Sequence, residues 1–344
     1  MNLYDNAYLI EFEANIEASG SDARGAYVLL DTSAFFAEGG GQSSDSGTIG
    51  DAVCACVHTV DGEKRHYVDK IPDSTKVNCK IDFDKRFRRM QNHSGEHIVS
   101  GIVHKMFGFD NVGFHLGEDD VTCDFSGELS RENLSEIEIA ANKIVFENRK
   151  INIFYPSKEE LENMTYRSKT ELSGDVRIVE IDGVDKCACC APHVSRTGEI
   201  GLIKILNPMK WKGGVRIHLK CGGDALSDYA WKYEQAAQIS ALLSIKQNEL
   251  FAGVSKLYSE SLEKDKIISA LRGEKIARTI ESIKNSDRNI VIFEYDADMD
   301  GLRKIVNAGA DKCAGVCAAF SGGPESFLFA LKSANKNAKT VLVR

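Results

Sequence analysis

The sequence predicts an α+β protein built from several domains. At 344 residues the chain exceeds the length of most single small domains. Short strand-like segments separated by Gly, Asp and Ser turns dominate its first quarter, whereas helical and strand patterns mix further along. With 43% hydrophobic and 27% charged residues, the composition is typical of a soluble globular protein. The expected architecture is an N-terminal antiparallel β-barrel, an α+β core, a helical arm and a small C-terminal α/β domain.

Residues 1–83 are expected to form the barrel, with a β-sandwich as the alternative. Their strand-like segments are AYVLLDTSAFF, DAVCACVHTV and KVNCKIDF. Residues 84–225 form the α+β core. Two helices are predicted there from RFRRMQNHSGEHIVSGIVHKMFG and SRENLSEIEIAANKIVFENRK, and strands from DVTCDFSG, DVRIVEIDG, GLIKILNPMKW and GGVRIHLKCGG.

Residues 226–285 carry helical, charge-rich patterns typical of a helical hairpin or coiled-coil arm, with a break expected at Gly253. Residues 286–344 alternate strand-like and helical segments and predict a small α/β domain. These segments are NIVIFEYDAD, MDGLRKIVNAG, CAGVCAAFSG, PESFLFALKSAN and KTVLVR.

Charge and cysteine content favour a protein of the cytoplasm. The N-terminus lacks a basic segment followed by an apolar core, and no run approaches the roughly 20 apolar residues of a membrane span. Ten irregularly spaced cysteines suit a reducing compartment, where they are small buried side chains or metal ligands. A net charge of −8 argues against broad nucleic-acid binding but allows a local basic patch.

Two histidines lie one helical turn apart in QNHSGEHIVS. Residues four apart share a helix face, so His93 and His97 can present both imidazoles to one ion. A pair alone is equally compatible with a surface or capping role. A metal site needs further ligands from elsewhere in the chain.

The segment CACCAPH supplies a second pair, Cys189 and His193, at the same spacing. Pro192 disfavours helix at the preceding residue and favours a turn. Together with the histidine pair this gives three nitrogens and one sulfur, a set that suits Zn²⁺. Two alternatives remain open, namely that Cys187 and Cys190 are the ligands or that the cysteines are only packed.

Several separated motifs now point to a known family. FFAEGGGQSSDSG, QNHSGEHIVSG, VGFHLGEDDVTCDF and CACCAPHVSRTGEIGLIKI resemble, in this order, motifs of the editing domain of alanyl-tRNA synthetases and of freestanding AlaX-type alanyl-tRNA editing hydrolases. Threonyl-tRNA synthetases have a related domain. The resemblance covers about residues 1–225, and the remainder resembles the C-terminal extension of the long freestanding forms.

The resemblance implies a zinc-containing hydrolase of translation fidelity. It would cleave the ester between a wrong amino acid, serine or glycine, and the terminal ribose of tRNA(Ala). A site that hydrogen-bonds the serine hydroxyl rejects alanine better than an apolar pocket rejects serine. The family's metal positions fall on His93, His97, Cys189 and His193, which implies one Zn²⁺ per chain. No membrane partner is expected, and a homodimer through the C-terminal region is an open expectation.

The glycine-rich segment AEGGGQ is the first candidate for contact with the aminoacyl end. Gly39, Gly40 and Gly41 allow close backbone approach, and Gln42 is the side chain expected to act there. The alternative is a tight turn between strands.

Two further catalytic candidates are Glu96 and His115. Glu96 stands where the family often has glutamine, and we expect a local substitution near the site, an outer partner of an imidazole or a solvent-facing helix residue. His115 is expected to line the same pocket, the alternative being a hydrogen-bonded structural histidine.

Two basic clusters are candidates for phosphate contact, with ordinary solvated charge as the alternative. The first cluster comprises Lys85, Arg86, Arg88 and Arg89. The second comprises Lys210, Lys212, Arg216 and Lys220, and Trp211 offers it a stacking surface. Within the second cluster, the predicted tRNA-binding residues are Lys210, Lys212 and Arg216.

Two other function classes compete with the hydrolase. His93 to His97 also fits the H-x-x-E-H pattern of some metalloproteases, in which Glu96 is the general base. That interpretation leaves Cys189 and His193 without a role. A non-catalytic tRNA-binding module with structural zinc would explain four protein ligands.

Overall fold

The computed structural model describes residues 3–117, 121–168, 176–323 and 325–334. The chain divides into two compact units, Met1–Tyr233 and Glu234–Arg344. Both mix helices and strands, which confirms the predicted α+β class. Among the described residues, every helix is too short or too polar to cross a bilayer.

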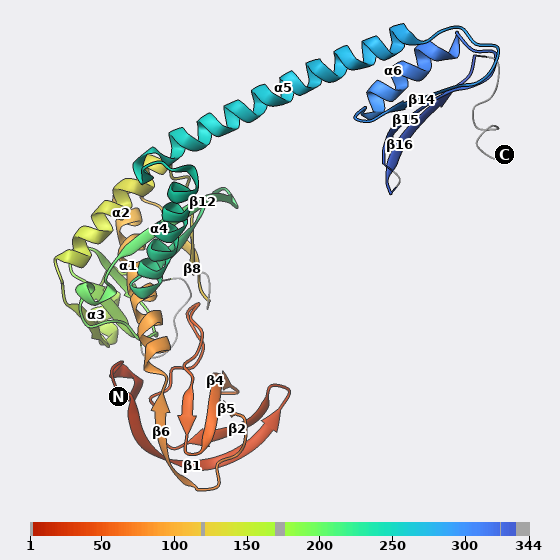
Figure 1. Ribbon diagram of the computed structural model, residues 1–344. Coiled ribbons are helices and arrows are strands. Elements are labelled where there is room, and N and C mark those ends of the chain that lie inside the picture. Colours follow the sequence, from red (N-terminus) through yellow and green to blue (C-terminus); the bar gives the residue numbers. More distant parts are fainter. Residues whose placement is uncertain (1–2, 118–120, 169–175, 324, 335–344) are drawn as a thin grey trace. The chain divides into compact units, whose positions relative to one another are not determined.

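The first unit begins with six antiparallel strands that form a closed barrel in the order β1-β2-β5-β4-β3-β6 (Figure 1). Alternating burial along β6 shows why the sequence folds this way, because every second side chain enters the barrel interior. Val28, Phe35 and Ile49 are fully buried there. The strands are β1 (Glu11–Asp22), β2 (Gly25–Leu30), β3 (Gly47–Ile49), β4 (Ala52–Val60), β5 (Glu63–Val68) and β6 (Lys76–Ile81).

Helix α1 (Phe83–Phe107) follows the barrel directly and is the central element of the unit. Asp82 caps its first turn by accepting from the Lys85 amide, and Gly108 ends it in the left-handed conformation. Added methyl groups at Gly95 and Gly101 would overlap Cys221 and the Val184 carbonyl. These glycines therefore let neighbouring segments approach α1 closely, despite the cost of about 1 kcal/mol that glycine carries inside a helix.

Two sheets and two more helices complete the core around α1. The four-stranded sheet has the order β12-β13-β8-β7 and the three-stranded sheet the order β11-β10-β9. Their strands are β7 (Asn111–Leu116), β8 (Val121–Phe125), β9 (Ile151–Phe154), β10 (Ile178–Ile181), β11 (Asp185–Ala188), β12 (Ile203–Trp211) and β13 (Gly214–Cys221). The helices are α2 (Arg131–Phe146), α3 (Lys158–Glu162) and α4 (Gly223–Leu243), the last of which continues into the second unit.

The basic cluster at the start of α1 is not a surface patch, so the phosphate-contact expectation is wrong for its buried members. Arg86 is fully buried and donates to Asp45 and to the carbonyls of Ala7, Leu9 and Ala34. This buried ion pair fixes α1 to the barrel.

Its two arginine neighbours are also engaged. Arg89, 6% exposed, donates to the Ser44 carbonyl at 2.6 Å, and Arg88 pairs with Asp224. Of this cluster, Lys85 keeps a largely exposed side chain.

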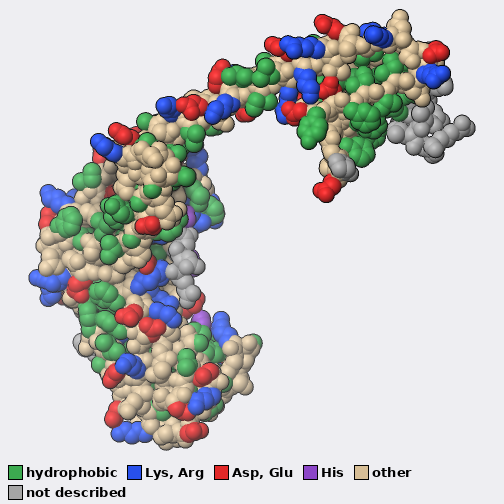
Figure 2. All heavy atoms as spheres, in the orientation of Figure 1, with side chains coloured by type: hydrophobic (Ala, Val, Ile, Leu, Met, Phe, Trp, Pro, Cys, Tyr) green, Lys and Arg blue, Asp and Glu red, His purple; other side chains and the backbone are tan. Residues whose placement is uncertain are grey.

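The second unit contains the long helix α5 (Leu250–Ser282) and a small α/β domain. β14 (Ile290–Glu294) pairs parallel with β15 (Cys317–Gly322), which pairs antiparallel with β16 (Phe327–Lys332), and α6 (Met299–Ala310) packs on this sheet. Figure 2 shows hydrophobic and charged side chains of both signs along α5. The predicted closing segment KTVLVR lies outside the described residues.

The break predicted at Gly253 is wrong, because Gly253 lies inside α5. The chain turns earlier, at Ser244, which adopts a positive φ of 54°. A side chain at Gly253 would overlap Ile245, so the glycine permits this turn to pack against α5.

Candidate metal centre

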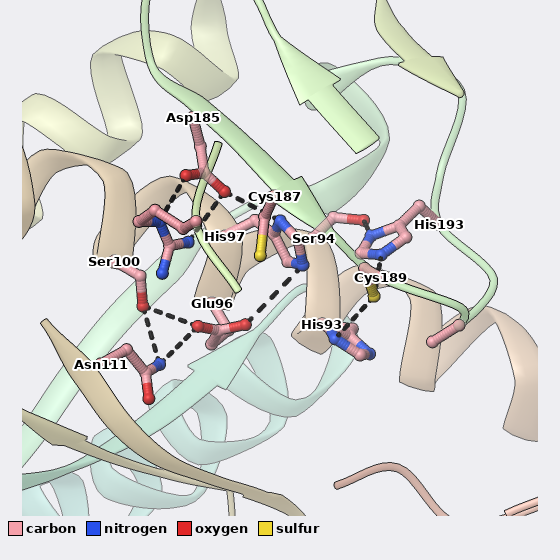
Figure 3. A network of polar contacts seen from close by, with 12 residues as sticks. His93, Ser94, Glu96, His97, Ser100, Asn111, Asp185, Cys187, Cys189 and His193 are labelled. Carbon is pink, nitrogen blue, oxygen red and sulfur yellow. Dashed lines mark hydrogen bonds and ion pairs between the residues drawn. The ribbon is translucent and has the colours of Figure 1, made fainter. Parts of the chain in front are cut away.

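The four predicted ligands come together from two segments that are far apart in sequence. His93 and His97 project from one face of α1, whereas Cys189 and His193 lie in the turn after β11. The donor atoms of all four lie within 4.8 Å of one another. The three histidines are at most 2% exposed. Figure 3 shows the four side chains converging on one point between α1 and this turn.

Distances within the cluster suit a tetrahedral ion. Cys189 Sγ lies 3.5 Å from His93 Nε2 and 3.3 Å from His193 Nε2. Zn–N and Zn–S bonds at the tetrahedral angle would place such donor atoms about 3.6 Å apart. The donor set and its spacing therefore fit Zn²⁺.

Each histidine is held through its other ring nitrogen, which leaves Nε2 for the ion. An outer hydrogen bond of this kind fixes the ring orientation and tautomer of a metal-binding imidazole. The Nδ1 contacts are His93 to Gln42 Oε1 at 2.8 Å, His97 to Asp185 Oδ2 at 2.9 Å, and His193 to Ser94 Oγ at 3.0 Å.

Asp185 in turn forms a bidentate ion pair with Arg167, at 2.6 and 2.8 Å. The pair is largely buried, with side-chain exposures of 2% and 15%. Burial alone would raise the pKa of Asp185, but His97 and Arg167 outweigh it and lower that pKa. Asp185 therefore remains a charged acceptor for His97.

The turn carrying Cys189 is held by the side chain and the backbone of Arg177. Its Nη1 donates to the carbonyls of Cys189 and Ala191 at 2.8 and 2.9 Å, and the Cys189 amide donates to the Arg177 carbonyl at 3.0 Å. Arg177 is 5% exposed. The sequence analysis did not identify four residues that support the cluster, namely Arg177, Asp185, Arg167 and Ser94. Only Asp185 and Ser94 stand near a recognised motif.

The electrostatics of the cluster favour the metal-binding forms of Cys189 and His193, but not that of His97. Burial opposes ionisation of Cys189, but His93 and His193 outweigh it and hold the pKa of this thiol well below its usual range. Burial lowers the pKa of His193 to about 3, which keeps the ring neutral. At His97 burial is outweighed by Asp185 and Cys189, and the pKa rises. A metal ion therefore competes with a proton at His97.

The glycine-rich segment is a tight turn that also delivers Gln42 to the cluster. Gly39 and Gln42 exchange backbone hydrogen bonds, and Gly40 and Gly41 adopt positive φ values of 60° and 81°. A Cβ at Gly41 would lie 2.5 Å from the Phe114 carbonyl oxygen. The two interpretations of AEGGGQ are thus compatible, since the turn geometry places the buried Gln42 against His93.

Glu96 and His115 differ in location. Glu96 is fully buried on α1, so the solvent-facing alternative is wrong. His115 is exposed on β7, whereas its neighbour Phe114 contacts the His93 ring at a centroid distance of 4.7 Å. Adjacent strand residues point to opposite faces. The structure therefore does not bring His115 into the cluster.

The predicted tRNA-binding residues lie on the β12–β13 hairpin, apart from the cluster. Arg216 forms a bidentate ion pair with Asp124 at 2.6 and 2.7 Å and lies 3.8 Å from the Trp211 ring centroid. Lys210 and Lys212 are exposed at the hairpin end. Lys210 also pairs with Glu128 at 3.5 Å, and Lys212 Nζ lies 5.4 Å from the Trp211 ring centroid, but both lysines keep exposed side chains.

The metalloprotease interpretation does not fit this arrangement. It requires Glu96 to face water above the histidine pair and leaves Cys189 and His193 elsewhere. In the structure Glu96 is buried, and both Cys189 and His193 lie beside the histidine pair.

Comparison with known proteins gives a consistent result. Residues 176–218 match the family described as Threonyl and Alanyl tRNA synthetase second additional domain. The alanyl-tRNA editing protein AlaX-M of Methanosarcina mazei is 34% identical over 221 residues, which cover 58% of this chain and 87% of that protein. The alanine–tRNA ligase of Ignicoccus hospitalis is 31% identical over 302 residues, covering 83% of this chain and 33% of the ligase.

A second ligase, from Halobacterium salinarum, is 31% identical over 334 residues, or 90% of this chain and 36% of the ligase. The chain thus spans about a third of the length of the ligases it matches. By contrast, it covers most of the freestanding AlaX-M protein. The chain therefore belongs to the family of AlaX-type alanyl-tRNA editing proteins.

Proposed function

We propose that this protein is a trans-editing hydrolase of the cytoplasm that deacylates mischarged Ser-tRNA(Ala), Gly-tRNA(Ala) or both. The observation that carries the proposal is the buried cluster of three histidines and one cysteine in a chain of the editing family. Relatives named alanyl-tRNA editing proteins support tRNA(Ala) as the partner.

One Zn²⁺ per chain would be held by the side chains of His93, His97, Cys189 and His193. When bound, such an ion acts as a Lewis acid that polarises a carbonyl, or as a template that orients the substrate. Asp185, Ser94 and Gln42 keep the three imidazoles in the orientation needed for binding.

The glycine turn is proposed as the contact with the aminoacyl end. Gly39, Gly40 and Gly41 lack side chains, so the terminal ribose and its ester can approach the backbone there. Notional Cβ atoms at Gly39 and Gly40 would lie 3.8 and 3.7 Å from Cys190 Sγ, which places the turn beside the segment carrying Cys189. Gln42 acts through His93, which makes it a positioning residue.

Serine or glycine, and not alanine, is the amino acid proposed to be released when the ester to the ribose is hydrolysed. A site that hydrogen-bonds the serine hydroxyl leaves polar groups unsatisfied when alanine occupies it, and such sites discriminate strongly. Lys210 and Lys212 are proposed to contact acceptor-stem phosphates, because their exposed ammonium groups can add affinity without sequence specificity.

A homodimer through residues 286–344 completes the proposal. Aromatic side chains on one face of the sheet of this segment support it, since Phe293 and Phe327 are 78% and 59% exposed and both rings contact Phe320. Sedimentation equilibrium of the full chain measures the assembly, and a purely monomeric chain at high micromolar concentration would contradict the dimer.

The test is a deacylation assay with matched substrates. Purified chain is incubated with Ser-tRNA(Ala), Gly-tRNA(Ala) and Ala-tRNA(Ala), with and without chelator, and amino-acid release is followed. We expect release from the mischarged species only, and its loss with chelator. Absence of release by folded, zinc-loaded protein would contradict the hydrolase.

One specific observation favours a second candidate. Four protein donors already fill a tetrahedral coordination sphere, as in structural zinc sites, whereas catalytic sites commonly keep one position open. The chain would then be a non-catalytic tRNA-binding module. Binding of mischarged tRNA without ester cleavage in the same assay would support this candidate.

A further inference from the structure

A buried carboxylate lies directly beside the metal centre without belonging to its four donors. Glu96 is fully buried, and its Oε2 lies 3.9 Å from His97 Nε2, the ring nitrogen left for the ion. Figure 3 shows Glu96 on the side of His97 away from Cys189 and His193. A buried carboxylate carries a large desolvation cost unless charge or hydrogen bonds compensate it.

Two donors fix the position of this carboxylate. Ser100 Oγ and Asn111 Nδ2 both donate to Glu96 Oε1 at 2.6 Å, and Asn111 Nδ2 lies 2.9 Å from Ser100 Oγ. Asn111 is itself held at the β-bulge that opens β7, where its Oδ1 accepts from the Gly113 amide at 3.1 Å. The carboxylate is thus fixed from α1 and from β7 at once.

The four donors alone would not neutralise the charge of a bound Zn²⁺. One cysteine thiolate offsets only one of the two charges of Zn²⁺, and the neutral histidines offset none. The other buried carboxylate that contacts the described cluster, Asp185, forms a bidentate pair with Arg167, which also interacts electrostatically with Glu96, so this one cation offsets only one of the two carboxylates. An uncompensated buried charge is costly, so a second carboxylate near the ion strengthens binding.

We propose that Glu96 is the counter-charge of the metal centre, a positioning residue that raises affinity for a divalent ion over a monovalent one. This inference rests on the zinc site of the proposed function. Residues Ser100 and Asn111 serve to hold the carboxylate in place.

The test compares metal affinities of the full chain by competition with chromophoric chelators. Glu96→Gln keeps the shape and removes the charge, and Ser100→Ala keeps the charge and removes one donor. Glu138→Gln is the matched control, because its carboxylate binds Lys204 and the Ile205 amide on β12. Each variant is titrated with Zn²⁺ and, anaerobically, with Cu⁺.

We expect Glu96→Gln to weaken Zn²⁺ binding by about 10- to 100-fold, the range typical of outer partners of metal sites. Cu⁺ affinity should change by less than about threefold, because one thiolate already balances a single charge. Ser100→Ala should weaken Zn²⁺ only slightly, and Glu138→Gln should match the wild type. A purely structural role of Glu96 would not alter the ratio of the two affinities.

Three results would overturn the proposal. These are a wild-type Zn²⁺ affinity in Glu96→Gln, an equal loss of Zn²⁺ and Cu⁺ affinity, or a loss in Ser100→Ala as large as in Glu96→Gln. Failure of the wild-type chain to bind Zn²⁺ would instead remove the zinc site itself. Deacylation is measured separately, so failure of the hydrolase assignment stays distinguishable.

Discussion

Replacing Asp185 with asparagine tests how the outer hydrogen bonds support the metal centre. Asp185→Asn preserves the shape of the side chain but removes the charge that His97 and Arg167 share. We expect the zinc dissociation constant to rise about 10- to 100-fold, which corresponds to about 1.4 to 2.7 kcal/mol. Without the carboxylate, the raised pKa of His97 should also fall.

The same change should lower the stability of the metal-free protein. Arg167 has a side chain only 15% exposed, so the variant leaves a largely buried guanidinium without its charge partner. Breaking a buried pair in this way costs about 3 kcal/mol or more. Chelator competition gives the zinc affinity, and urea unfolding of metal-free protein gives the stability.

Asp124→Asn provides the control for this experiment. Asp124 forms a similar bidentate pair with Arg216, but on β8 and β13 and with more exposed side chains. Because Asp124 is itself buried, its replacement should also lower stability, but it should leave zinc affinity unchanged. The reasoning is refuted if Asp185→Asn binds zinc as tightly as the wild type, or if the control weakens zinc equally.

Three further predictions follow from single features of the first unit. Cys189→Ala should reduce zinc content, measured by atomic absorption, well below one per chain, and retention of one zinc would show that the ligand set is wrong. Arg86→Met should lower the free energy of unfolding in urea by about 3 kcal/mol or more, because it leaves the buried Asp45 carboxylate without its charge partner. A variant as stable as the wild type would contradict the role of this ion pair. Burial lowers the pKa of His66 to about 4, so only the unfolded state gains this proton as pH falls from about 6.5 to 4. The free energy of unfolding should therefore decrease as the pH falls through that window. Its change with pH should be smaller in His66→Gln than in the wild type, and an equal change in both would exclude His66 as a cause of the loss of stability.

The ligands could be found from sequence because their spacing records local geometry. His93 and His97 repeat at one helical turn, and Cys189 and His193 flank a proline turn. Their outer partners follow no such rule. Arg167 reaches Asp185 through the tertiary fold, and a bidentate pair of this kind has no sequence signature.

Exposure was the property that sequence predicted least well. The basic residues before the metal helix have the composition of a phosphate-binding surface, yet Arg86 is fully buried by its pair with Asp45. Glu96 likewise became interpretable only when Ser100 and Asn111 were found to enclose it. Burial depends on which elements pack together, and a local pattern contains little of that information.

Helix and strand positions were predicted better than the breaks between them. The helix of QNHSGEHIVS extends from Phe83 to Phe107, close to its predicted range. At Gly253 the sequence suggested a helix break, but the glycine is needed for packing of Ile245 and the helix continues. A glycine alone does not distinguish a break from a close contact.

The most direct test of the central claim is the ratio of single-turnover deacylation rates for Ser-tRNA(Ala) and Ala-tRNA(Ala) with zinc-loaded chain. Discrimination by a buried hydrogen bond to the serine hydroxyl predicts a ratio of about 10³ or more. Hydrolysis of both substrates at similar rates, or of neither when Gly-tRNA(Ala) is also left intact, would contradict the proposed editing function.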